Sequence, residues 1–219
     1  MNELATPITI SYGDGIGSEI MESVLMLLRE SGANISVETI EIGQRIYNMG
    51  AKYGILPSAW EILRRNRVLL KAPVIIPHST DYEYKDIDEI IYKKFSLSSE
   101  NLYICNIIPE EYGADWLAGT ENIGENFALF GVLHDSAPEI AGKNIANPSA
   151  MIQAIIMMLN HIGQGDAAEL IRRAWLQTIN EGIHTADMYN KKISRKKVGT
   201  AEFVESIIEK IGKYRYYSG

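Results

Sequence analysis

The sequence lacks several features that would place it in a specialised class. Its 219 residues include a single cysteine, Cys105, so no disulfide can form within the chain. A small secreted domain held together by disulfides is therefore excluded. No apolar stretch approaches the ~18 uninterrupted residues of a membrane-spanning helix. The first residues have neither the basic stretch nor the apolar run of a signal peptide, so we expect a cytoplasmic protein.

Positive charge is also scarce. The chain has 21 Lys and Arg side chains against 28 Asp and Glu, which leaves a formal charge of −7. Nonspecific binding to nucleic-acid phosphates needs clustered cations, so we expect neither nucleic acid nor a membrane as a partner. The one basic cluster, residues 191–197, is interpreted as a solvated loop rather than a phosphate-binding patch.

Hydrophobic periodicity predicts an α/β fold. A β-branched strand over residues 7–11 runs through a glycine-rich turn into a helix over 18–28, and an alternating strand follows at 35–40. This strand–turn–helix–strand order is typical of a mostly parallel mixed sheet flanked by helices. Further elements are predicted as a helix after Pro57, strands at 68–73 and 101–105, and helices at 150–161, 166–181 and 201–211.

The absence of repeats and low-complexity linkers favours one domain over residues 1–212, followed by a C-terminal tail at 213–219. The second half is expected to be mainly helical. Its helix at 150–161 is apolar nearly all round and should be buried in the core. We therefore interpret Met157 and Met158 as core residues rather than cofactor contacts.

Two loop segments are candidates for a site. Residues 13–17, Gly-Asp-Gly-Ile-Gly, lie between a strand and a helix, where backbone amides could face a ligand. The spacing differs from the dinucleotide fingerprint G-x-G-x-x-G, so a structural turn and a ligand loop both stay open. Residues 134–148 are irregular, carry a polar group at nearly every second position, and end in the helix-start signal Pro148-Ser149.

Together these segments resemble the isocitrate and isopropylmalate dehydrogenases, and bacterial isocitrate dehydrogenases most closely. The resemblance covers approximately residues 6–95 and 113–212, which correspond to the family's large domain. It is carried by Tyr12-Gly13-Asp14-Gly15-Ile16-Gly17, Leu70-Lys71-Ala72-Pro73, Leu117-Ala118-Gly119, Asn122-Ile123-Gly124, His134 to Pro148, Met157-Met158-Leu159, Gly182 to Asp187 and Lys197-Val198-Gly199-Thr200.

The resemblance also implies what is missing. Family members are much longer, and this chain passes from the Pro73 region to the Leu117 region almost directly. In the family, the missing middle forms a small domain that supplies a dimer clasp, a catalytic Tyr and Lys, and a substrate Arg. A chain can lose one inserted domain and keep the core of the other.

Two further positions depart from the family pattern. Where the family holds the substrate carboxylates with Ser, Asn and Arg, the register through Tyr84-Lys85 places Asp86, Asp88 and Tyr92. Isocitrate is a trianion, and at ~4 Å each like-charge pair costs about 1 kcal/mol in water. The run Asn101-Leu102-Tyr103 continues into Ile104 and Cys105 without the family's metal-binding Asp residues, and the next carboxylates are Glu110 and Glu111. No metal is therefore expected.

The cofactor half is better preserved. By resemblance, His134 and Ile140 would enclose an adenine, and Asn147 would bond its edge. Glu139 stands where members that use NAD have Asp, and a carboxylate there favours NAD over NADP. Asp135 and Gly131 replace a Gly and a Glu of the family. The predicted cofactor-binding residues are His134, Ser136, Ala137, Glu139, Ile140, Asn147 and Gly15.

The remaining candidates are weaker. His78, His161 and His184 show no metal-ligand spacing, and His184 is interpreted as a hydrogen-bonding element. Cys105 falls in an apolar strand, which favours a buried inert thiol over a nucleophile.

Oxidative decarboxylation needs a metal, a base and an acid, and none is identifiable in the sequence. The first hypothesis is therefore a catalytically incompetent binding or regulatory protein that keeps affinity for NAD or another adenine nucleotide. A small NAD-dependent dehydrogenase with a rebuilt site is the second. A partner subunit of a full-length dehydrogenase, or a homo-oligomer, is the third.

Overall fold

A six-stranded sheet forms the centre of the molecule in the computed structural model, which describes residues 4–77, 86–108 and 117–218. The strand order across the sheet is β2-β1-β3-β6-β5-β4. The strands are β1 Thr6–Ser11, β2 Ile35–Thr39, β3 Val68–Lys71, β4 Leu102–Cys105, β5 Gly119–Ile123 and β6 Ala128–Val132.

The four strands β2, β1, β3 and β6 pair in parallel, whereas β5 and β4 are antiparallel to their neighbours. This confirms the predicted fold class. Strands β5 and β6 were not predicted, because the second half of the chain was expected to be mainly helical. Strand β6 in fact joins the two parts of the chain, since it pairs with β3 on one side and β5 on the other.

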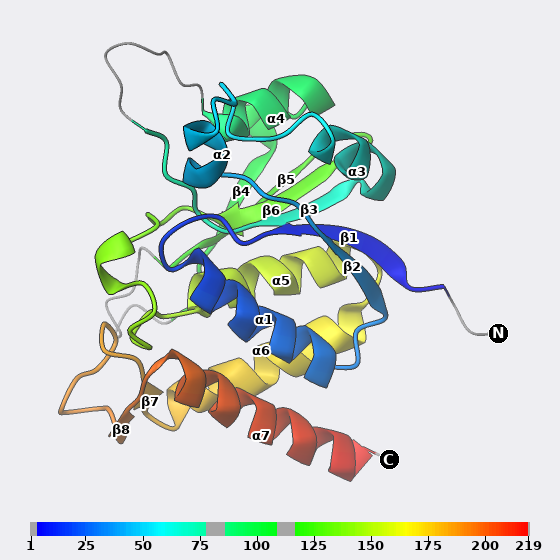
Figure 1. Cartoon of the computed structure of the whole chain (residues 1–219). Helices are drawn as coiled ribbons and strands as arrows, with labels where there is room; N and C mark the ends of the chain where they lie inside the picture. Colours follow the sequence, from blue (N-terminus) through cyan, green and yellow to red (C-terminus); the bar gives the residue numbers. More distant parts are fainter. Residues whose placement is uncertain (1–3, 78–85, 109–116, 219) are drawn as a thin grey trace.

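Helices cover both faces of the sheet (Figure 1). One face carries α2, α3 and α4, and the other carries α1 and α5, with α6 and α7 beyond them. The helices are α1 Gly17–Glu30, α2 Gln44–Asn48, α3 Ala59–Asn66, α4 Ile87–Phe95, α5 Ser149–His161, α6 Gly165–Asn180 and α7 Thr200–Ser218. Shorter elements are the 3-10 turns η1 Ser99–Asn101 and η3 Pro138–Ile140, and the strand pair β7 Ile183–His184 and β8 Lys196–Lys197.

The larger core lies on the α1, α5 and α6 side of the sheet. Helix α5 is buried from Ser149 to Leu159, as its continuous apolar sequence predicts. Met157 and Met158 both belong to this core, which confirms their interpretation as packing residues. Trp175 of α6 is fully buried, and its indole nitrogen donates to the Ser149 hydroxyl over 3.2 Å. Aromatic N–H groups need such a partner when they are buried.

A second, smaller core lies on the opposite face. Leu63 of α3 and Ile87 and Ile91 of α4 are fully buried there against Leu69 of β3. Phe95 stacks on Phe127 at a ring-centroid distance of 3.9 Å. Residues 87–95 form a helix because Asp86 caps it, which the sequence analysis did not predict.

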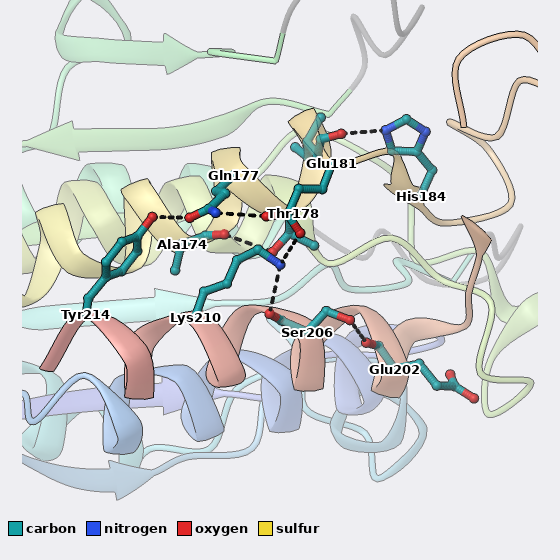
Figure 2. Close-up of polar contacts among 10 residues, drawn as sticks. Ala174, Gln177, Thr178, Glu181, His184, Glu202, Ser206, Lys210 and Tyr214 are labelled. Atoms are coloured by element: carbon teal, nitrogen blue, oxygen red, sulfur yellow. Dashed lines mark hydrogen bonds and ion pairs between the residues drawn. The ribbon is translucent and has the colours of Figure 1, made fainter. Parts of the chain in front are cut away.

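Helix α7 packs against α6 through a line of polar contacts (Figure 2). The Lys210 ammonium lies 3.0 Å from the Glu181 carboxylate, and the Tyr214 hydroxyl donates to Gln177. The predicted helix end at residue 211 is therefore wrong, and residues 213–218 of the expected tail belong to α7. Helix α7 continues to Ser218 because residues such as Tyr214 still contact its neighbour.

In the part of the chain that the structure describes, no helix combines the length and the apolar character needed to cross a membrane.

Candidate functional site

The loops that follow β1, β3 and β6 meet at one edge of the sheet (Figure 1). These strands are parallel, so their carboxyl ends point the same way. The chain leaves β1 toward β2 and returns on the other side in β3, which makes this edge a point where strand order reverses. Ligands of open α/β sheets bind in such places.

The glycine-rich turn is held by its protein neighbours. Gly13 and Gly15 have φ values of +60° and +58°, which favour glycine. A Cβ on Gly13 would lie 2.0 Å from the Pro73 carbonyl oxygen, and one on Gly15 would lie 1.8 Å from that of Ser136. The amide of Asp14 donates to Pro73 over 2.8 Å. Close packing therefore accounts for both glycines.

Four of the predicted cofactor residues line one depression, which we call the His134 hollow. It has a volume of about 220 Å³ and is lined by His134, Ala137, Ile140 and Asn147. Its other lining residues are Ile16, Leu117, Asp135, Ile145, Ala146 and Asp187. The structure therefore brings together residues from the start of α1, from the loop after β6, and from the segment after β7.

Two side chains give the hollow its polar character. The Nε2 atom of His134 is buried and has no hydrogen-bond partner among the described residues, while Nδ1 lies 3.0 Å from the Asp135 carbonyl oxygen. The Asn147 amide donates to Asp187 over 3.0 Å, and its oxygen accepts from the amide of Ser149 at the start of α5. Asn147 thus connects the hollow to a helix N-terminus.

Asp187 is a member of the hollow that the sequence analysis missed. Its carboxylate accepts from the Thr185 hydroxyl over 2.6 Å as well as from Asn147. Asn147 and Asp187 are 40 residues apart in the sequence, and no local pattern connects them. The match of Gly182 to Asp187 to the family was the one available signal.

The other three predicted cofactor residues do not line the hollow. Ser136 is buried, and its carbonyl oxygen accepts from the amide of Ile16 over 2.7 Å. Glu139 is exposed on η3. Gly15 contacts Ser136 and faces a different depression between α1 and α7. Their role as cofactor contacts stays a prediction.

A second cavity lies beside β3, at the segment expected to meet the substrate. It measures about 70 Å³, and Lys71, Asp88, Tyr92 and Asn122 are among its lining residues. The Lys71 ammonium is buried and lies 3.2 Å from the Asp88 carboxylate. Asp86 instead caps α4 by accepting from the amide of Asp88 over 2.8 Å.

Only some of the polar groups around this cavity have hydrogen-bond partners among the described residues. Burial raises the pKa of the Tyr92 phenol; the hydrogen bond with Asn122 opposes this change, and Asp88 and Asp86 add to it. The Asn122 side-chain oxygen is buried without a partner among the described residues. Asp88 and Tyr92 therefore line the same cavity as Lys71, and the Asp88 carboxylate forms an ion pair with the Lys71 ammonium.

The segment where the family has its metal-binding Asp residues forms strand β4 at the sheet edge. Tyr103 and Ile104 are exposed there, and burial raises the pKa of the half-buried Cys105 thiol, with Glu121 adding to the effect. A raised pKa lowers the reactive thiolate fraction. Within residues 4–77, 86–108 and 117–218, no three His, Cys, Asp or Glu side chains are grouped to hold a metal ion. His78, Tyr84-Lys85, Glu110 and Glu111 lie outside the described residues.

His184 is a hydrogen-bonding element, as predicted. Its Nε2 lies 3.0 Å from the Ile179 carbonyl oxygen, which requires an N–H there, and its Nδ1 lies 2.7 Å from the Ser194 hydroxyl. Figure 2 shows the ring turned toward the end of α6. Burial lowers the pKa of this imidazole, while the hydrogen bond to Ile179 and the charge of Asp187 oppose the change.

Comparisons with known proteins show the family of this chain. The family model described as isocitrate/isopropylmalate dehydrogenase matches residues 116–207. An isocitrate dehydrogenase [NADP] of Rickettsia conorii is 31% identical over 339 aligned positions, covering 95% of this chain and 70% of the relative. The chain belongs to the isocitrate/isopropylmalate dehydrogenase family. A 3-isopropylmalate dehydrogenase of Methanothermobacter thermautotrophicus is 45% identical over 91 residues, which are 42% of this chain and 26% of that one.

The alignment with the Rickettsia conorii enzyme is much longer than this chain. Since 95% of 219 residues is about 208, about 130 of the 339 positions aligned with the Rickettsia conorii enzyme face gaps in this chain. This agrees with the expected loss of the middle of the sequence.

Solved structures show the same fold. The TT0538 protein from Thermus thermophilus matches with a TM-score of 0.79 at 20% identity, covering 95% of this chain and 68% of that one. An isocitrate dehydrogenase from Methylococcus capsulatus matches with a TM-score of 0.74 at 19% identity, over 94% of this chain and 99% of that one. At such identities the likeness shows the fold alone.

Proposed function

We propose that this chain is a family member that binds the adenosine part of a nucleotide and does not catalyse oxidative decarboxylation. The observation that carries the proposal is the His134 hollow. It combines apolar walls from Ala137 and Ile140 with polar atoms on His134, Asn147 and Asp187. Small-molecule sites have this composition, with few polar groups in a mostly apolar wall.

The size of the hollow supports a ligand of limited extent. Its volume of about 220 Å³ is below the roughly 300–1,000 Å³ of pockets that enclose a whole drug-sized molecule. An adenine ring with its ribose is therefore the part of a dinucleotide that this hollow would enclose. The unpartnered Nε2 of His134 is a polar atom that such a ligand could contact.

The charge of the hollow supports an adenosine without a 2′-phosphate. Asp135 and Asp187 line it, and Glu139 is exposed on the adjoining turn η3. A carboxylate accepts hydrogen bonds from a ribose diol and repels a phosphate on the same sugar. We therefore propose NAD, ADP-ribose or AMP as ligands, although the Rickettsia conorii relative is named an NADP enzyme.

The cavity beside β3 supports the loss of decarboxylation. Asp88 forms an ion pair with the buried Lys71, and Asp86 is used as a helix cap. An ammonium already paired with a carboxylate has little net attraction left for a multiply charged acid, and two carboxylates on α4 add repulsion. The volume of about 70 Å³ leaves room for a few water molecules rather than a tricarboxylate.

Calorimetry with AMP, ADP-ribose, NAD and NADP tests the binding half of the proposal. We expect AMP, ADP-ribose and NAD to bind with similar affinity, because all three present the same adenosine, and NADP to bind more weakly. Ile140→Glu should abolish binding by placing a charge in the hollow. Leu133→Glu is the matched control, since Leu133 is exposed nearby and does not line the hollow. Absence of heat at millimolar ligand would contradict the proposal.

A turnover assay tests the catalytic half. Purified protein is incubated with NAD or NADP, Mn²⁺ and a panel of 2-hydroxy acids that includes isocitrate. We expect no formation of reduced nucleotide. Metal-dependent reduction of either nucleotide would reject the proposal and favour a small dehydrogenase with a rebuilt site.

A further inference from the structure

Helices α1 and α7 form a groove with an apolar floor and an acidic rim, which we call the acidic groove. Its volume is about 480 Å³, and Met26 and Val204 lie among its apolar lining residues. Glu19, Glu22 and Glu205 also line it, and no Lys or Arg is among the lining residues that the structure describes. Met26 is 41% exposed, which is unusual for an apolar side chain beside a core helix.

The carboxylates of the rim differ in what they contact. Glu19 is used within the protein, because it accepts from the amide of Gly142 over 3.0 Å and from the Thr200 hydroxyl. Glu22 shares a hydrogen bond with the Tyr12 hydroxyl, but Glu22 and Glu205 are both exposed, and neither belongs to an ion pair in the described part of the chain. Two negative charges thus stand beside an apolar floor without a cation to balance them.

The same chain carries a surface with the opposite properties. Residues 191–197, which we call the basic segment, read Lys-Lys-Ile-Ser-Arg-Lys-Lys and contain five of the chain's 21 basic side chains. Ile193, in the middle of these cations, is 46% exposed. Among the ion pairs of the described residues, none includes a cation of the basic segment.

The basic segment has a defined shape. Ser194 accepts from the amide of Asn190 over 2.8 Å and contacts His184, while the amide of Arg195 donates to the Gly182 carbonyl oxygen over 2.8 Å. Figure 1 shows this orange loop extending outward beyond the start of α7. These contacts order the loop while Ile193 stays exposed. Binding of the basic segment to a partner would therefore cost little further conformational entropy.

We propose that the acidic groove binds the basic segment of a second copy of this chain. Ile193 would pack on the exposed Met26 above the buried Val204, and the flanking Lys and Arg side chains would meet Glu22 and Glu205. An apolar residue ringed by cations is complementary in both shape and charge to an apolar groove ringed by carboxylates. Repulsion between net-negative copies, at −7 each, is reduced because the contact joins surfaces of opposite sign.

The positions of the two surfaces favour a reciprocal pair. The basic segment ends at Lys197, and the acidic groove begins at Thr200 and Ala201 of α7. Because the surfaces adjoin on one molecule, a two-fold arrangement can place each basic segment in the groove of the other copy. In such a two-fold interface every contact occurs twice, and no surface is left over to bind a third copy.

Sedimentation equilibrium of the full chain over a range of protein and salt concentrations tests the proposal. We expect a monomer–dimer equilibrium that shifts toward monomer at high salt, because salt screens exposed charges. The paired variant Glu22→Lys with Glu205→Lys, and the paired variant Lys191→Glu with Lys192→Glu, should each weaken dimerisation by about tenfold or more. The Ile193→Ser variant should weaken it without changing the net charge.

A variant with the charges exchanged across the contact provides the decisive test. Combining all four reversals restores opposite charges across the contact, so dimerisation should recover toward the wild-type constant. The control pair Glu61→Lys with Arg64→Glu reverses two exposed charges of α3 and should leave dimerisation unchanged. A strict monomer at all concentrations, or a dimer indifferent to the reversals, would overturn the proposal.

Discussion

Asp88 illustrates how one side chain changes the chemistry of a site. The resemblance implies an uncharged amide-bearing residue at this position, and a carboxylate there was expected to repel an anionic substrate. In the structure the carboxylate has a partner, because the buried Lys71 lies 3.2 Å away. A buried ammonium without a counter-charge is costly. Asp88 therefore stabilises Lys71 as well as changing the electrostatics of the cavity.

His184 has the clearest titration at the residue scale. Both of its ring nitrogens are hydrogen-bonded in the neutral form, to Ile179 and Ser194, and burial lowers the pKa of the imidazole. In the unfolded chain the pKa returns to about 6.5. Between that pH and the lower pKa of the folded state, the unfolded state binds more protons than the folded state, so the free energy of unfolding falls as the pH drops.

The corresponding prediction compares the wild type with His184→Gln. Between about pH 7 and pH 5, the wild type should lose stability more steeply, by up to about 1.4 kcal/mol per pH unit for one proton. Urea unfolding at each pH measures the slope. His161→Gln is the control, because His161 is exposed at the end of α5. Equal slopes in wild type and His184→Gln would contradict the assignment.

At the scale of elements, α6 and α7 are joined by more than apolar packing. Lys210 is buried, contacts Glu181 at the end of α6 and contacts the Ser206 carbonyl oxygen over 3.5 Å (Figure 2). The Lys210 ammonium holds the pKa of the Glu181 carboxyl below its usual value, and a weaker contribution comes from Gln177. Because Glu181 is 38% exposed, water screens part of this interaction.

Removing the ammonium should loosen the contact between these helices. We expect Lys210→Met to lower the free energy of unfolding by about 1 kcal/mol, a value reduced for the exposure of Glu181. Thermal unfolding followed by circular dichroism measures the loss. A double-mutant cycle with Glu181→Gln should give a favourable coupling energy for the pair.

Lys213→Met is the matched control for that cycle. Lys213 is exposed one turn along α7 and forms no ion pair among those of the described residues, and its charge makes only the smallest contribution to the lowered pKa of Glu181. Like Lys210→Met, the Lys213→Met variant removes one positive charge from α7. If Lys213→Met were as destabilising as Lys210→Met, net charge rather than the contact with Glu181 would explain the effect.

At the scale of the whole molecule, one sheet separates two cores. Leu63 belongs to the core on the α3 side and Ile171 to the core on the α5 side, and both are fully buried. The central strands contribute to both, since Leu69 packs on one face and Leu70 on the other. We therefore expect the two cores to unfold together.

Two core truncations test this cooperativity. Leu63→Ala and Ile171→Ala should each lower the free energy of unfolding by about 2–4 kcal/mol. Each should move a single transition as a whole when unfolding is followed by circular dichroism and by tryptophan fluorescence. A biphasic curve in either variant would show that the two faces unfold as separate units and would contradict the expected single domain.

Local patterns in the sequence were sufficient for several parts of this protein. Helix α1 follows from the 3.6-residue period of its apolar residues, whereas strand β1 follows from its β-branched apolar run and helix α5 from its nearly continuous apolar sequence. The two loop segments at 13–17 and 134–148 identified the family, and four of the seven predicted cofactor residues line one hollow. Strands β5 and β6 were missed because short strands between loops have weak periodic signals.

Only the tertiary structure shows which side chains from separate segments contact each other, because the periodic pattern of a sequence describes each helix or strand by itself. Three contacts join residues that are separated along the chain. They are the hydrogen bond between Asn147 and Asp187, the ion pair between Lys71 and Asp88, and the close packing of Gly15 against the Ser136 carbonyl oxygen. Each depends on the order in which parallel strands are assembled, because that order determines which loops share an edge. The sequence alone therefore determined the family, the fold class and the strongly patterned elements such as β1, α1 and α5, whereas the path of the chain determined which side chains meet.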